Sequence, residues 1–292
     1  MKRKKKNYED YVLDIAIYLT MVVVAVVTFY PMWYVVACSF STSTEVIKHP
    51  GIFLWPENPT IGAYKLVFDD PLIISGFVNI LKILIIALPI NIVMTVLCGY
   101  YMSCSKMMFK KPIVWMMLFT MYFSGGMIPA YLNIRELGML NTIWSLVIPG
   151  CLSIYNAIIC KTAIEAIPDS LCESAYIDGA NDFQVLFRIV LPLIKATLAV
   201  LLLYYGVGHW NSWFNASIYI KENEKLPLQN ILRGILLANQ GSADKNMMDK
   251  YNAYAETIKY AAIVVATVPI LCIYPLLQKH FVKGVMIGAV KG

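Results

Sequence analysis

The residue types that carry out catalysis and metal binding are scattered along this chain without a reactive pattern. Seven cysteines stand at positions 38, 98, 104, 151, 160, 172 and 272, form no Cys-x-x-Cys pair and fall mostly inside apolar runs. The three histidines, His49, His209 and His280, lie too far apart in the sequence for metal-ligand spacing. We therefore predict no catalytic residue and no metal site, and we interpret the cysteines as packing residues.

One segment has a spacing that suits recognition of a partner protein. Residues 165–192 combine acidic side chains, small residues and a glycine. Pro168 ends one helix or begins the next, and Ser170-x-x-Glu173 has the spacing of a capping box. Gly179 permits a backbone turn or a close approach. The pattern predicts a helix, a turn and a second helix.

The second helix of this segment is expected to have one apolar stripe. Asp182 can cap the helix, and Phe183, Leu186, Phe187 and Val190 follow at i, i+3, i+4 and i+7. Such a helix can bury its stripe against the bilayer, against its own helix bundle or in a groove of another protein. Composition alone leaves these three alternatives open.

The elements that position this segment are predicted to be membrane-spanning helices. The 292 residues are 59% hydrophobic and 14% charged, whereas a soluble domain carries about 25% charged residues. Mean hydropathy is +0.64. Stretches of roughly 20 apolar residues, the length that crosses a bilayer, lie at 12–38, 74–103, 112–132, 140–161, 187–209 and 259–281. We therefore predict an all-α integral membrane protein with six transmembrane helices.

The placement of basic residues favours a cytoplasmic location for both termini. Positions 2–6 are all Lys or Arg, and short basic segments stay in the cytoplasm. An apolar run follows this cluster at once, so we do not expect nucleic acid as a partner. The predicted organisation is a cytoplasmic N-terminus at 1–11, a membrane domain at 12–281 and a cytoplasmic tail at 282–292. Within the membrane domain, loop 165–192 is cytoplasmic and loop 210–257 is external.

Residues 173–192 resemble the EAA signature of permeases from binding-protein-dependent ABC transporters. Glu173-Ser174-Ala175 is followed after three residues by Gly179, and after nine more by Ile189-x-Leu191-Pro192. Ser174 replaces the first alanine of the signature and is also small. Gly125-Gly126-Met127-Ile128-Pro129 and residues 284–292 are similar to the corresponding regions of carbohydrate-importer permeases like the second permease of the maltose system.

The resemblance implies that loop 165–192 is a coupling helix that docks into an ATP-binding subunit. The residues it implies for this contact are Glu173, Ser174, Ala175, Asp178, Gly179, Ala180, Phe183, Phe187, Ile189, Leu191 and Pro192. No G-x-x-x-x-G-K-[ST] motif occurs in the chain. The permease is therefore expected to bind no cofactor and to have no ATPase activity of its own, with ATP and Mg held by a partner subunit.

The same resemblance implies an assembly in the bacterial cytoplasmic membrane, which the chain crosses several times. Its expected partners are a second homologous permease, two ATP-binding subunits and an extracellular substrate-binding lipoprotein, besides the carbohydrate and membrane lipid. The external loop 210–257 is the expected docking surface for the binding protein, with a passive connector as the alternative.

Five residues in or beside the spans are candidates for lining the carbohydrate path. Polar and aromatic side chains in or beside the spans could contact a sugar, namely Asn79, Asn91, Tyr122, Tyr155 and Asn156. Hydrogen bonding between helices is the alternative for the same residues. Two other functions stay open, an ABC importer for a non-sugar solute and an ATP-independent secondary transporter. The latter would show ion-coupling charges within spans.

Overall fold

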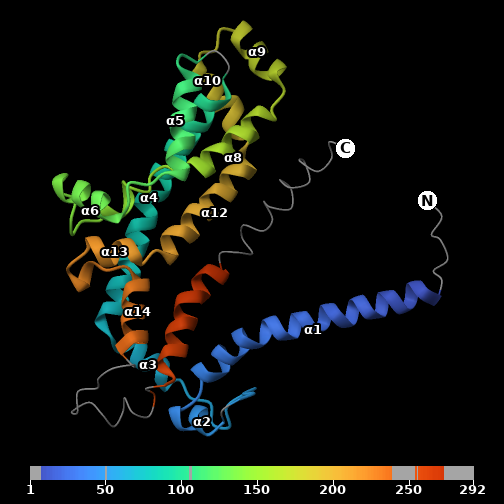
Figure 1. The fold of residues 1–292 in the computed structure, drawn as a ribbon, viewed down its shortest axis with the longest axis vertical. Helices are drawn as coiled ribbons and strands as arrows, with labels where there is room; N and C mark the ends of the chain where they lie inside the picture. Colours follow the sequence, from blue (N-terminus) through green and yellow to red (C-terminus); the bar gives the residue numbers. More distant parts are fainter. Residues whose placement is uncertain (1–7, 50, 105–106, 239–253, 255, 273–292) are drawn as a thin grey trace. The chain divides into compact units, whose positions relative to one another are not determined.

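The computed structural model describes residues 8–49, 51–104, 107–238, 254 and 256–272, and the regular structure in these ranges is helical, without strands (Figure 1). In chain order the helices are α1 (Tyr8–Ser39), α2 (Ser43–Lys48), α3 (Gly62–Asp69), α4 (Pro71–Ser103), α5 (Lys110–Tyr122), α6 (Met127–Glu136), α7 (Trp144–Val147), α8 (Ile154–Glu165), α9 (Asp169–Ile177), α10 (Asp182–Val185), the π-helix η1 (Leu186–Val190), α11 (Leu191–Leu193), α12 (Lys195–Asn211), α13 (Phe214–Tyr219), the 3-10 helix η2 (Asn223–Lys225) and α14 (Leu228–Ala238). A further apolar helix covers Ile258–Cys272.

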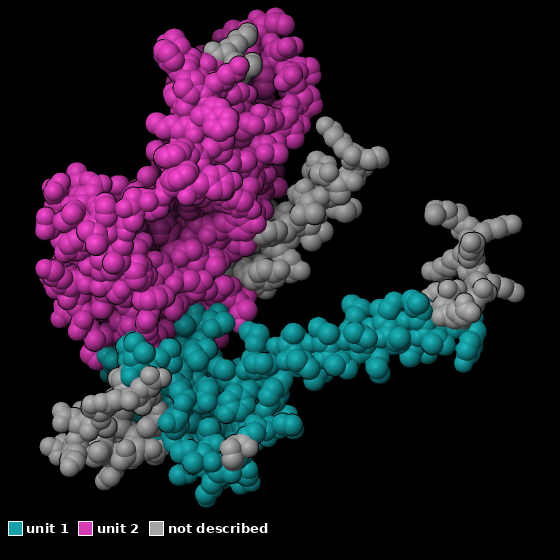
Figure 2. All heavy atoms as spheres, in the orientation of Figure 1, with its two compact units in different colours: residues 1–70, 234–267 teal, residues 71–233, 268–292 magenta. Residues whose placement is uncertain are grey.

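The chain divides into two compact units, shown in different colours in Figure 2. Unit 1 contains residues 1–70 and 234–267, and unit 2 contains residues 71–233 and 268–292. In unit 1 the end of α1 buries Ala37 and Cys38 against Phe53. Tyr34 adds edge-on ring contacts with Phe53 and with Tyr260. The rest of α1 exposes its apolar side chains, as expected of a helix that faces lipid.

Unit 2 is organised around α4, which packs against α8 and α12. Its main core joins α4 and α8 to the segment that runs from α10 into α12. The buried members are Val96, Tyr100, Cys160, Ile164, Val185, Leu186, Val190, Ile194 and Leu201. Residues of the predicted coupling loop are therefore anchored directly on long helices of the bundle.

Two helices of the described residues are long and apolar enough to cross a membrane, and up to four spans are possible if each bent helix pair counts as one. Tyr11–Ser39 and Pro71–Ser103 have 29 and 33 residues and lie where the first two spans were predicted. The last predicted span, 259–281, is described only as far as Cys272, and its remainder lies outside the described residues. The second half of the predicted external loop 210–257 is likewise mostly outside them.

The span predicted at 112–132 is not one straight helix. α5 and α6 meet at an angle of 114° across the break between Tyr122 and Met127. Gly126 in this break has φ +89°, a conformation that ends a right-handed helix and that glycine adopts readily.

The span predicted at 140–161 is likewise interrupted. α7 ends at Val147 and α8 begins at Ile154, with Pro149 and Gly150 in the irregular segment between them. Side chains from two other helices satisfy this segment. Asn91 Nδ2 donates to the carbonyls of Gly150 and Cys151 at 2.9 and 3.0 Å, and Ser153 N donates to Tyr205 Oη at 3.0 Å.

The predicted span 187–209 is bent by 81° between Leu193 and Lys195. The π-helical turn Leu186–Val190 comes directly before α11, whose first turn contains Pro192. Because proline has no N–H, Pro192 cannot donate to the carbonyl of Arg188. The wide turn and the missing hydrogen bond together redirect the chain, so the segment before Leu193 belongs to the loop rather than to a straight crossing helix.

Candidate functional site

The first helix of loop 165–192 begins without the capping box that the sequence suggested. Pro168 is the N-cap of α9, and no side chain caps that end. Ser170 lies inside the helix, so the predicted pair Ser170 and Glu173 does not form a capping box. Asp169 in the first turn places a negative charge at the positive end of the helix dipole.

Gly179 ends α9 in a closed turn. Its φ is +82°, which side chains with a Cβ adopt only with strain. The N–H of Gly179 donates to Tyr176 O at 3.1 Å, and the N–H of Ala180 donates to Ala175 O at 2.9 Å. These two bonds form a Schellman motif. The sequence assigned Gly179 to the turn, and the backbone conformation gives the reason.

The second helix is capped by Asn181, and the prediction of Asp182 as the cap is wrong. Asn181 Oδ1 accepts from Gln184 N, and Gln184 Oε1 accepts from Asn181 N, both at 2.9 Å. This reciprocal pair is a capping box. The Asn-x-x-Gln spacing was readable in the sequence, but the neighbouring acid was chosen instead.

Asp182 has a different role, because its carboxylate ties the two helices of the loop together. Tyr176 Oη donates to Asp182 Oδ1 at 2.7 Å, and Tyr100 Oη of α4 lies 3.4 Å from Tyr176 Oη. The hydrogen bond with Tyr100 favours the phenolate of Tyr176, but desolvation and the Asp182 carboxylate outweigh it and raise the pKa of Tyr176. The phenol therefore stays protonated and keeps donating at neutral pH. Sequence reasoning missed this chain of contacts because Tyr100 is 76 residues from Tyr176.

The predicted apolar stripe of the second helix is split between two environments. Leu186 and Val190 are buried, together with Val185, in the core of unit 2. Phe183 and Phe187 instead expose 68% and 61% of their surface. A π-helical turn at Leu186–Val190 follows α10 and breaks the regular 3.6-residue register after Val185. The helix thus packs on its own bundle and still presents two rings outward.

Loop 165–192 exposes four large apolar side chains and two acids. Phe183 and Phe187 are joined by Ile177 and Leu171, which expose 85% and 43% of their surface. We call these four residues the coupling surface. Glu173 and Asp178 are exposed nearby in sequence, and their carboxylates have no ion pair or hydrogen bond within the described part of the chain. Large exposed apolar groups with an acidic margin are typical of an interaction site.

The other predicted coupling residues lie on the inner side of the loop or at its end. Ala175, Ala180 and Leu191 are partly buried and pack against the core of unit 2. Ile189 is partly buried, whereas Ser174 and Pro192 are exposed. The small residues of the motif therefore bring α9 close to the bundle, and the large ones face outward.

The five residues predicted for a carbohydrate path are not gathered in one place. Asn79 Nδ2 donates to the carbonyls of Glu224 and Leu226. Asn91 is completely buried, and its Oδ1 lies 2.9 Å from His209 Nε2. Both amides thus hold segments of unit 2 together.

The other three candidates differ in exposure. Asn156 is buried, and Tyr122 and Tyr155 are exposed. Tyr122 and Tyr155 are therefore the two most exposed members of the set, and Asn79 is half-buried.

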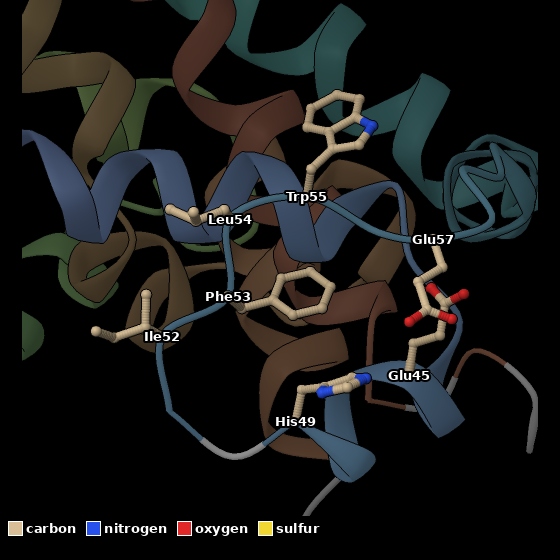
Figure 3. A pocket seen from close by; sticks show the side chains of 7 residues that line it. All are labelled: Glu45, His49, Ile52, Phe53, Leu54, Trp55 and Glu57. Carbon is tan, nitrogen blue, oxygen red and sulfur yellow. The ribbon is translucent and has the colours of Figure 1, made fainter.

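Unit 1 has a shallow cavity of about 220 Å³ in the segment after α1 (Figure 3). Its lining consists of Glu45, His49, Ile52, Phe53, Leu54, Trp55 and Glu57. Glu45 Oε1 already accepts from the backbone and side-chain amides of Asn58. Within the described ranges, no group of three or more His, Cys, Asp and Glu side chains is arranged to hold a metal ion.

Comparison with known proteins finds the family described as binding-protein-dependent transport system inner membrane component, whose model matches residues 99–287. The polygalacturonan/rhamnogalacturonan transport system permease of Bacillus subtilis is 37% identical over 281 residues, 96% of this chain and 98% of that protein. The galactooligosaccharides transport system permease of the same organism is 26% identical over 282 residues, 94% of each chain.

A solved structure gives the same result for the fold. A chain from a bacterial ABC transporter involved in the import of the acidic polysaccharide alginate superposes with a TM-score of 0.88. It is 27% identical in sequence and covers 96% of this chain and 100% of its own.

Proposed function

Because this chain belongs to the family of binding-protein-dependent transport system inner membrane components, we propose that it is one permease subunit of an ATP-driven ABC importer and forms half of the path for an oligosaccharide. A second, homologous permease forms the other half. Two ATP-binding subunits dock on the cytoplasmic side, and an extracellular lipoprotein delivers the substrate.

The observation that carries this proposal is the construction of loop 165–192. A capping box and a Schellman motif fix its backbone, and Phe183 and Phe187 project from it. Exposed aromatic rings on a rigid support are typical centres of protein interfaces. Glu173 and Asp178 add charged contacts at the margin.

The packing of the loop supports a role in transmitting force. Ala175, Ala180 and Leu191 join it to the core formed by α4, α8 and α12. When nucleotide closes the two ATP-binding subunits, a docked loop moves with them and carries these helices along. Nucleotide binding thereby shifts the bundle between inward-facing and outward-facing states.

The chain is proposed to cross the bacterial cytoplasmic membrane six times, with both termini in the cytoplasm. The basic residues at positions 2–6 favour this orientation. It places loop 165–192 on the same side as ATP. Since the sequence has no phosphate-binding G-x-x-x-x-G-K-[ST] loop, ATP and Mg²⁺ belong to the partner subunits and this chain is not itself an enzyme.

The proposed substrate class follows from the relatives. Their names refer to polygalacturonan and rhamnogalacturonan, to galactooligosaccharides and to alginate. We propose an oligosaccharide, and Tyr122 and Tyr155, whose rings are exposed, are the proposed contacts among the five predicted residues.

The test is reconstitution of the complete importer in liposomes, with its two permeases, ATP-binding subunits and binding protein. The expected result is ATP-dependent uptake of labelled oligosaccharides, tested with galacturonate, alginate and galactose oligomers, and ATPase activity that rises with loaded binding protein. Uptake that needs an ion gradient but no ATP would instead indicate a secondary transporter. Uptake of a peptide or phosphate ester in place of every sugar would overturn the carbohydrate assignment.

A further inference from the structure

Helix α5 carries an exposed row of aromatic side chains. Trp115, Phe119 and Tyr122 follow at i, i+4 and i+7 and so share one helix face, and they expose 73%, 57% and 78% of their surface. Phe123 extends the row, with its ring stacked on Phe119 at a centroid distance of 4.4 Å. We call these four residues the α5 aromatic stripe.

The stripe is not the face by which α5 attaches to its own unit. α5 packs against α4 and α8, and Val114 and Met117 supply the apolar contacts there. No residue of α5 is buried. The stripe therefore lies on a side that unit 2 leaves uncovered.

The stripe leads into an open break of the backbone. α6 turns away from α5 at this point (Figure 1), and Ser124, Gly125 and Gly126 are exposed. The N–H of Gly126 donates to Ser124 Oγ at 3.2 Å. The N–H groups of Gly125 and Met127 have no partner among the described residues, and neither has the hydroxyl of Tyr122.

The basic start of α5 at Lys110 and the length of the helix lead us to expect these polar groups at membrane depth. From Lys110 at its basic end, α5 rises about 18 Å to Tyr122, whereas the hydrocarbon core is about 30 Å thick. Backbone polar groups at such a depth are tolerated only where they are covered by protein or line a water-filled cavity. Contact with lipid tails alone would leave the hydroxyl of Tyr122 and the peptide groups of the break unsatisfied.

We propose that the α5 aromatic stripe and the break at residues 123–126 form a carbohydrate subsite in the translocation path. Sugar rings stack their C–H faces on the aromatic rings, and sugar hydroxyls hydrogen-bond to the open peptide groups and to Tyr122 Oη. This inference rests on the proposed function and assigns the subsite to this subunit rather than to its partner permease.

The composition of the stripe favours sugar over the second permease as its occupant. Interfaces between membrane helices are enriched in small residues that let backbones approach closely. The stripe instead presents two phenylalanines, a tryptophan and a tyrosine. Trp115, Phe119 and Tyr122 lie about one helical turn apart, so one oligosaccharide can contact several rings at once.

The first test compares Tyr122→Leu with Phe29→Leu in the reconstituted importer. Phe29 is an exposed aromatic of α1 and serves as the matched control. With loaded binding protein in excess, we expect uptake by Tyr122→Leu to fall about 2- to 10-fold, the loss that one aromatic contact represents. ATPase stimulation and uptake by Phe29→Leu should stay at wild-type levels. Wild-type uptake by Tyr122→Leu would overturn the subsite.

The second test replaces Tyr122 by a photoreactive p-benzoylphenylalanine and illuminates the importer during turnover with labelled oligosaccharide. Covalent label on this chain is expected. Cross-linking only to the second permease or only to lipid would refute the subsite while leaving the import function intact. If the wild-type importer neither takes up any oligosaccharide nor raises its ATPase activity with loaded binding protein, the proposed function itself fails, and the subsite fails with it.

Discussion

Two glycine turns in unit 2 have similar positive φ angles and different surroundings. Gly179 in the coupling loop has φ +82°, and Gly126 between α5 and α6 has φ +89°. Around Gly179 the backbone is closed by its own hydrogen bonds, and only side chains face outward. Around Gly126 the N–H groups of Gly125 and Met127 have no partner among the residues that the structure describes. The contrast teaches that the described residues close the backbone of the coupling loop, whereas at the α5–α6 break they leave two peptide N–H groups without a partner.

The largest effect is expected from Gly179→Asp, which places a side chain in the closed turn at the end of α9. A side chain at φ +82° is strained, and a second carboxylate beside Asp178 adds repulsion at the coupling surface. We expect transport to be lost while the protein still reaches the membrane, measured by uptake and by immunoblotting of membranes. Gly206→Ala is the control, because Gly206 has no positive φ and an added Cβ there would meet only open space. Normal uptake by Gly179→Asp would count against coupling through this loop.

The second-largest effect is expected from removing the two exposed rings of loop 165–192. This change tests whether these rings contact the ATP-binding subunit. The double variant Phe183→Ala/Phe187→Ala removes two exposed rings without touching the buried Leu186 and Val190. We expect its affinity for the ATP-binding subunit to fall about 30-fold, as for loss of an interface hot spot, measured by pull-down titration. Phe68→Ala, an exposed phenylalanine of α3, is the control. If the double variant and the wild type bind the ATP-binding subunit with equal affinity, the two rings are not the docking site.

A third irregular segment extends the comparison, because residues 148–153 are closed by side chains rather than by their own backbone. Asn91→Leu removes the donor to Gly150 O and Cys151 O and the partner of His209. We expect destabilisation by about 1–3 kcal/mol, the usual result of unsatisfied buried polar groups. Thermal unfolding in detergent measures it, with Val93→Leu on the exposed face of α4 as control. An unchanged unfolding midpoint would mean that water replaces the amide.

The sequence predicted those features that depend on residues close together in the chain. The long apolar runs became α1 and α4, and Gly179 was assigned to a turn that its left-handed backbone requires. The Asn181–Gln184 capping box also had a local signal, although Asp182 was chosen. These features are decided by propensity and spacing within a few residues.

The features that were missed depend on contacts across the fold. Hydropathy over 112–132 and 140–161 cannot show where a span breaks, since glycine and proline also occur in continuous membrane helices. Asn91 and Tyr205 satisfy the backbone of the irregular segment at residues 148–153 by hydrogen bonds. They come from helices that are far away in sequence. The exposure of Phe183 and Phe187 likewise depends on which side of the helix the core of unit 2 covers, and a 3.6-residue pattern alone does not decide this.

The smallest effect is expected from Tyr176→Phe, which removes one hydrogen bond that closes the coupling loop. Because Tyr176 is about half exposed, we expect a loss of about 1 kcal/mol, measured as the coupling with Asp182→Ala in a double-mutant cycle. Since the pKa of Tyr176 is raised from 10.0 in the folded protein, the neutral phenol is the stabilised form. Its contribution is full below pH 10.0 and is lost as the pH rises through the raised pKa. The wild-type advantage over Tyr176→Phe should therefore be constant from about pH 6 to 8 and decrease in strong alkali. An advantage that changes within that neutral range would mean that another group titrates there and that the loop is not closed by this phenol.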